Sequence, residues 1–234
     1  MPAGREIPDF GPADALNVNL YPDLVAKGGL ALAIKRLSEE IRVDIPHVHT
    51  QPNSGRYTSA KVDSNRGVIS VLLGVEKRIF SIKIASDTHV WASGGTEDLS
   101  KVIKVIFAWQ NGSTLKELRE EFPFMGYEKL AEAYEQGNPV PVQWDLLLKD
   151  RSYTNIGNLL RAVHSREELR TRFPYVSHGM LRLTESPFSR SPNEIWIAPL
   201  STIGYQVEIS GSPESRTECG TLEEAINAAI ACLI

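Results

Sequence analysis

The chain has 234 residues, 42% of them hydrophobic and 23% charged, which is enough for one large domain or two small ones with adequate cores. The formal net charge of −4 argues against a cationic field over the whole molecule, so non-specific binding of nucleic-acid phosphates is not expected.

The first residues do not resemble a targeting segment. Residues 1–17 are polar and contain Pro2, Pro8 and Pro12, so they lack the apolar core of a signal peptide. No other stretch approaches the roughly 18 consecutive apolar residues of a membrane span. Two cysteines, Cys219 and Cys232, are too few for a disulfide framework. We expect a cytoplasmic protein with no membrane partner, whose residues 1–20 form an extended arm.

Residues 21–110 are predicted to form a first α+β half. A helical pattern begins at Pro22, breaks at Gly28-Gly29 and ends before Pro46, because proline disfavours helical geometry in the residue that precedes it. Residues 47–56 have the composition of a loop. Strands are predicted at 57–62, 68–73, 78–85 and 89–92, with a hairpin connection at 74–77.

A further helix is predicted after these strands, opened by Gly95-Thr96-Glu97-Asp98. Thr96 can cap the exposed backbone N–H groups, and the two acids favour the positive end of the helix dipole. The apolar residues that follow repeat at helical spacing and form one face. They are Leu99, Val102, Ile103, Ile106 and Phe107.

Residues 111–150 are predicted to be a helical connector. Residues 113–121 form a short helix that is stopped by Phe122-Pro123, and residues 127–135 form another. The Gly- and Pro-containing stretch 136–142 then breaks the pattern. An apolar segment at 144–148 follows it.

Residues 151–234 repeat features of the first half. At a separation of 128 residues, 39–42 align with 167–170 and Ile45-Pro46 aligns with Phe173-Pro174. At a separation of 125, the strand 80–84 aligns with 205–209 and residues 95–98 align with 220–223. Thr221 and Glu224 also fit a capping box. The order of these matches favours a tandem duplication.

The predicted fold is therefore α+β. It has two tandem related halves, each helix, antiparallel strands, helix, packed as a pseudo-dimer around the helical connector. The predicted boundaries are 1–20 for the arm, 21–110 for the first repeat, 111–150 for the connector and 151–234 for the second repeat.

Aromatic residues flank proline at two predicted helix exits. In Phe122-Pro123-Phe124 and Phe173-Pro174-Tyr175, proline fixes the backbone and the rings can pin the chain to the core. The alternative is a peptide-binding groove, in which Phe124 and Tyr175 would contact a partner. Trp109, Trp144 and Trp196 are expected to be core residues.

Ser177, His178 and Arg182 are the candidate site residues for acid/base chemistry or anion binding. Ser177 and His178 precede a predicted strand, Met180–Leu183, which contains Arg182. No carboxylate lies close enough in sequence to orient His178, and no nucleophile elbow is present. His47 and His49 share one side of an extended segment, yet lack further ligands at convincing spacing. We therefore predict no metal site and no cofactor. The turn at 94–96 lacks the spacing of a phosphate-binding motif.

Several motifs together resemble a bacterial family of uncharacterised proteins labelled as associated with natural-product biosynthesis. They are Tyr21-Pro22 with Gly28-Gly29-Leu30, residues 92–99 with the helix ending at Trp109, Phe122-Pro123-Phe124, and residues 173–182. The resemblance covers most of the chain from residue 20 onward. It implies an accessory role in a specialised bacterial pathway and brings no reaction or catalytic residues.

These observations lead to one functional expectation and two alternatives. We expect a non-catalytic accessory protein that binds a peptide or protein partner, in a groove between antiparallel sheets. An immunity protein that neutralises a toxin is the first alternative, because an acidic surface suits a basic toxin. An enzyme that uses Ser177, His178 and Arg182 is the second. The oligomeric state is left open.

Overall fold

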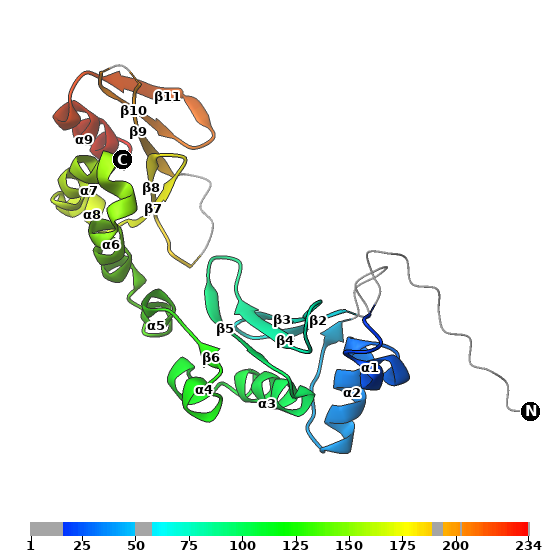
Figure 1. The fold of residues 1–234 in the computed structure, drawn as a ribbon. Helices are drawn as coiled ribbons and strands as arrows, with labels where there is room; N and C mark the ends of the chain where they lie inside the picture. The colour runs from blue at the N-terminus through cyan, green and yellow to red at the C-terminus, as the bar shows by residue number, and fades with distance from the viewer. Residues whose placement is uncertain (1–15, 50–57, 189–193, 202, 234) are drawn as a thin grey trace, which may run out of the picture. The chain divides into compact units, whose positions relative to one another are not determined.

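The computed structural model describes residues 16–49, 58–188, 194–201 and 203–233, so most of the predicted arm lies outside the described residues. The chain divides into two compact units, residues 1–128 and 129–234. Each unit has its own antiparallel sheet and its own helices (Figure 1), which confirms the α+β class. The boundary falls inside the stretch predicted to be a helical connector.

The first unit is a six-stranded antiparallel meander with helices. Its sheet has the strand order β1-β2-β3-β4-β5-β6, and α3 contacts β2, β4 and β5. The elements are α1 (Pro22–Lys27), α2 (Leu30–Glu40), β1 (Val48–His49), β2 (Ser59–Ser64), β3 (Gly67–Leu73), β4 (Phe80–Ala85), β5 (Val90–Thr96), α3 (Leu99–Gln110), α4 (Leu115–Glu121) and β6 (Met125–Gly126).

Alternation of apolar and polar residues places the core of this unit between the sheet and α3. In β4, Phe80, Ile82 and Ile84 are buried while the residues between them are exposed, as expected for a strand with one covered face. The predicted apolar face of α3 is buried with one exception. Phe107 is 40% exposed, because its position lies just outside the buried stripe.

The helix start predicted at Thr96 is wrong. Thr96 and Gly94 belong to β5 and pair with Phe80 and Ile82, and the cap of α3 is Asp98, whose carboxylate accepts the Ser100 N–H at 2.8 Å. The strand continues through Gly94 because β6 pairs with it there. A Cβ at Gly94 would lie 2.3 Å from the Phe124 carbonyl oxygen.

The second unit is a five-stranded antiparallel meander, in the order β11-β10-β9-β8-β7. Its elements are α5 (Lys129–Glu135), α6 (Pro139–Lys149), the 3-10 helix η2 (Arg151–Ile156), α7 (Gly157–His164), α8 (Glu167–Arg170), β7 (Phe173–Ser177), β8 (Met180–Thr184), β9 (Ile195–Pro199), β10 (Tyr205–Ile209), β11 (Ser212–Cys219) and α9 (Leu222–Ala231). The break predicted at 136–142 is too long, because Pro139 starts α6 and proline is tolerated in the first turn of a helix.

The aromatic-proline segments lead into strands. Phe173-Pro174-Tyr175 lies within β7 rather than at a helix exit, and β6 begins directly after Phe124. The loop predicted at 47–56 contains the short strand β1 before residues 50–57, which lie outside the described ranges. A proline can occupy β7 because this strand is at the edge of its sheet.

The two units share an order of elements. In each, helices precede five strands of an antiparallel meander, and a helix that packs against the sheet follows the fifth strand. Buried residues of α3 recur in α9 at a separation of 123 residues, for example Ile103 and Ile226. The predicted match of residues 95–98 with 220–223 is wrong, because Thr96 is in a strand whereas Thr221 caps α9. The duplication itself stays a prediction.

Candidate functional site

Most of the predicted site residues lie on one hairpin of the second sheet, β7–β8. Leu181 and Leu183 point toward the helices and are buried. Arg182 lies between them in the strand and therefore points to the opposite face. Register then aligns four side chains across four strands on that outer face. They are Tyr175, Arg182, Trp196 and Glu208, and we call them the Arg182 row.

Arg182 lies among aromatic rings at the centre of the row. Its guanidinium carbon is 4.3 Å from the Trp196 ring centroid and 5.7 Å from that of Tyr175, which are cation–π distances. Its Nη1 atom is 3.7 Å from Glu194 Oε2. The same oxygen accepts the Trp196 indole N–H at 3.0 Å. Glu194 and Trp196 thus hold the guanidinium over the sheet.

The hydrogen-bonding capacity of Arg182 is not filled within this cluster. A guanidinium has five N–H donors, but the 3.7 Å contact with Glu194 is longer than a hydrogen bond. The buried Nε atom has no hydrogen-bond partner among the described residues. The nearby carboxylate of Glu208 is occupied elsewhere, since its Oε2 accepts from Arg216 Nε at 2.8 Å and from Gln206 Nε2 at 3.1 Å.

Tyr175 completes the aromatic surroundings as a protonated phenol. Burial and a hydrogen bond with Glu194 raise the pKa of Tyr175, and the interaction with Arg182 opposes them. The phenol therefore stays a hydrogen-bond donor at physiological pH. Around Arg182 the outer face thus presents two aromatic rings, Tyr175 and Trp196, and the carboxylate of Glu194. This combination of groups suits recognition of a partner.

His178 and Gly179 form the β7–β8 turn, and Ser177 is the last residue of β7 before it. His178 has φ 52° and Gly179 has φ 76°, as a two-residue type I′ hairpin requires. Ser177 Oγ lies 2.9 Å from His178 Nδ1, and the pair is exposed. Ser177 pairs with Met180, whereas Arg182 pairs with Tyr175, and no described contact joins His178 to Arg182.

Phe124, the remaining predicted binding residue, lies in the first unit, whereas the other four lie in the second. Its ring centroid is 6.0 Å from that of Phe122, and Phe122 is buried. Phe124 therefore has a local packing role next to β6.

Glu194, Trp196 and Glu208 belong to the site but were not predicted as site residues. Trp109 and Trp144 are buried as expected, but Trp196 is only partly buried and the core assignment for it is wrong. Alternation in Ile195-Trp196-Ile197 was the available signal, because both isoleucines face the core.

The first unit contains the two other kinds of site considered from the sequence, a metal site at His47 and His49 and a phosphate site at residues 94–96. His49 Nε2 lies 2.6 Å from Asp63 Oδ2. Within the described ranges, no three His, Cys, Asp or Glu side chains come together as metal ligands would. Gly94, Gly95 and Thr96 lie in β5, where they form no helix start that could hold a phosphate.

One comparison with known proteins gives a match. Residues 138–233 match a family model described as "Family of unknown function (DUF6193)". These residues lie within the second unit and include the whole Arg182 row. No curated protein and no solved structure matches the chain. None of the described helices combines the length and the apolar character needed to cross a bilayer.

Proposed function

We propose that the chain is a non-catalytic accessory protein whose second unit binds a peptide or protein partner on the outer face of the β7–β11 sheet. The Arg182 row carries this proposal. Tyrosine, tryptophan and arginine contribute most of the binding energy at protein interfaces, and here Tyr175, Trp196 and Arg182 stand side by side in adjacent strands.

The partner carries a carboxylate in the segment that contacts Arg182. Glu194 is 3.7 Å from the guanidinium and leaves N–H donors for a second acceptor. A carboxylate of the partner would form charge-assisted hydrogen bonds there. The neighbouring rings would exclude water and strengthen those bonds.

Binding is favoured over catalysis by the position of His178. A general base works best where water is excluded from the reacting atoms, but His178 lies in an exposed turn and Ser177, at the end of β7, is only partly buried. His178→Asn separates the two functions, because asparagine also tolerates positive φ and lacks the imidazole. Unchanged activity in the host pathway supports binding, whereas loss of activity with an unchanged melting temperature supports the enzyme alternative.

The remaining expectations are part of this proposal. The resemblance favours an accessory role in bacterial natural-product biosynthesis in the cytoplasm. The common order of elements in the two units supports a tandem duplication. The immunity-protein alternative requires a partner of opposite charge. A basic toxin would present cations to the acidic chain, whereas the proposed partner presents a carboxylate to Arg182.

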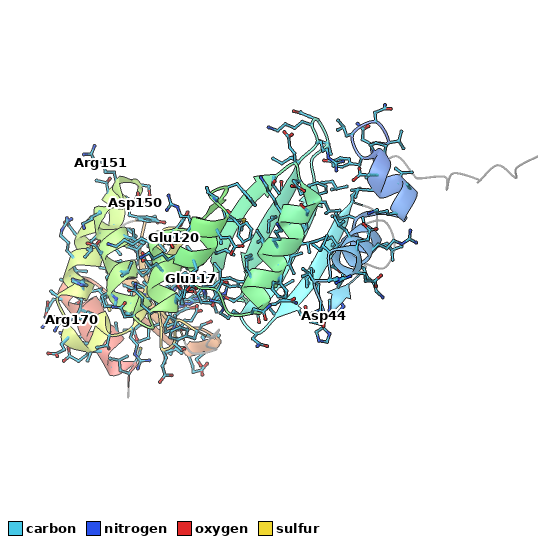
Figure 2. The ribbon with its side chains drawn as sticks, turned by 90° about the horizontal axis from the view of Figure 1, so that it is seen from below. Asp44, Glu117, Glu120, Asp150, Arg151 and Arg170 are labelled. Atoms are coloured by element: carbon cyan, nitrogen blue, oxygen red, sulfur yellow. The ribbon has the colours of Figure 1, made fainter. Side chains whose placement is uncertain are left out.

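The test is affinity capture from the native host with three variants of the full chain. Wild type and Arg170→Ala, which changes an exposed arginine on α8 (Figure 2), should retain the same partner. Trp196→Ala and Arg182→Ala should lose it while their melting curves remain cooperative. Capture of one set of proteins by all variants would refute the proposal. If the bound segment of the partner contained no acidic residue, the proposed contact between Arg182 and a carboxylate of the partner would be refuted.

A further inference from the structure

We infer that a pocket between the end of α6 and the start of α7 binds a small organic acid with an apolar body. The pocket lies in the second unit and has a volume of about 180 Å³. Leu147 and Leu160 form its apolar lining and are buried, and Tyr153 and Leu148 are partly buried beside them. It shares no residue with the Arg182 row, so it is a separate site.

Cations outnumber acids around this pocket. Lys149, Arg151 and Arg161 line it, together with one acid, Asp150. The Asp150 carboxylate already accepts the backbone N–H and the hydroxyl of Ser152, both at 2.8 Å. Those two hydrogen bonds lower the pKa of Asp150, so it remains ionised.

The three cations are not equivalent. Lys149 forms an ion pair with Asp145 at 2.6 Å. Arg151 points away from the ribbon in Figure 2. Arg161 donates to the neutral Asn158 Oδ1 at 2.8 Å and makes no ion pair with any described carboxylate. Arg161 is therefore the cation of this pocket whose charge is available to pair with a bound anion.

The position of Arg161 favours an anion beside it. A Cβ added to Gly157 would lie 3.4 Å from Arg161 Nη1, so the guanidinium is folded back over the first residue of its own helix. The N–H of Gly157 is already used, because η2 runs directly into α7 and this N–H donates to the Thr154 carbonyl. Arg161 is therefore the positive group beside Gly157 that a bound carboxylate would compensate.

The size of the pocket limits the ligand. A dry cavity of about 150 Å³ accommodates benzene, so a volume of about 180 Å³ suits one ring or a short alkyl chain. The carboxylate would contact Arg161 and the apolar body would contact Leu147 and Leu160. Benzoate is a suitable probe, and neutral benzamide of the same shape is its control.

The test is a titration of the ¹⁵N-labelled full chain followed by NMR. Benzoate should shift the Gly157 amide saturably, and benzamide should bind about tenfold more weakly or worse, because a charge-assisted hydrogen bond is lost. Arg161→Gln should lower benzoate affinity by about tenfold or more, Arg161→Lys should lower it less, and Arg170→Gln should leave it unchanged.

Three results would overturn the inference. They are equal affinity for benzoate and benzamide, no saturable shift at Gly157, and unchanged benzoate affinity in an Arg161→Gln variant whose spectrum shows the native fold. Because the experiment does not use the Arg182 row, its result does not depend on the proposed protein partner.

Discussion

Ile79 donates its backbone N–H to the hydroxyl of Tyr21 at 3.0 Å, although 58 residues separate them. The hydroxyl is surrounded by three carbonyl oxygens, the nearest of them that of Gly74 at 2.9 Å. Tyr21 is 1% exposed. Arg78 reinforces the contact by donating to both oxygens of Asp23 at 2.8 and 3.0 Å. The start of α1 is thus joined to the β3–β4 connection.

Tyr21→Phe should destabilise the chain by about 1–3 kcal/mol, because it removes the acceptor of the part-buried Ile79 N–H and the hydroxyl proton that one of the surrounding carbonyls accepts. Urea denaturation measures the change. Tyr127→Phe is the control, since the Tyr127 hydroxyl makes no hydrogen bond with a described residue. Equal midpoints for both variants would show that water replaces the Tyr21 hydroxyl.

Gly94→Ala should detach β6 from β5. The new methyl would meet the Phe124 carbonyl at 2.3 Å and Met125 Sδ at 2.8 Å, both closer than van der Waals contact. Gly126→Ala is the matched control in the partner strand, where the nearest atom is 3.9 Å away. Hydrogen exchange at residue 126, which pairs with Ser93 of β5, should accelerate in the first variant and change little in the second. Native protection in Gly94→Ala would contradict the close approach.

Thr221→Ala should cost about 1 kcal/mol of stability. Thr221 Oγ1 accepts the Glu224 N–H at 3.2 Å, and Glu224 Oε2 accepts the N–H groups of Thr221 and Gly220 at 3.2 and 2.8 Å. Thr221→Ser keeps the hydroxyl and should retain most of the stability. Thermal unfolding of the two variants is compared. If the cap matters, only Thr221→Ala loses stability, whereas an effect of lost side-chain volume would lower the melting temperature of both variants.

His89 should make stability fall as pH decreases below 6.5. Burial lowers the pKa of His89 from 6.5 to about 4, so the unfolded chain binds the proton first. The free energy of unfolding therefore decreases as pH falls from 6.5 toward 4 and its His89 contribution levels off below that. His89→Gln should flatten the plot of unfolding free energy against pH between 6.5 and 4. Above pH 7 the plots of the variant and of wild type should be parallel. An imidazole that titrates near 6.5 by NMR in the folded chain would contradict the prediction.

Sequence patterns predicted those helices and strands that are determined by residues close together in the chain. Alternation in Phe80–Ala85 gave the strand and its buried face, and Thr221 with Glu224 gave the start of α9. The start of α3 was misplaced because Gly94 and Thr96 serve pairing with strands elsewhere in the chain. Such a requirement has no local signal in the sequence.

The candidate site shows the same division. Tyr175 was predicted from its place beside Pro174, and Arg182 from its place a few residues after His178, so both predictions used neighbours in sequence. Trp196 and Glu194 join them only through the register between β8 and β9, across a connection that includes residues outside the described ranges. Side-chain neighbours across strands depend on that register, which follows from tertiary packing.

Both sheets are meanders, in which each strand pairs with its neighbours in the chain. Meanders need few contacts between distant segments, so their assembly during synthesis has a small entropic barrier. The last strand of the first sheet ends at Gly126. That sheet can therefore close as soon as Gly126 leaves the ribosomal tunnel, while most of the second unit is still being translated.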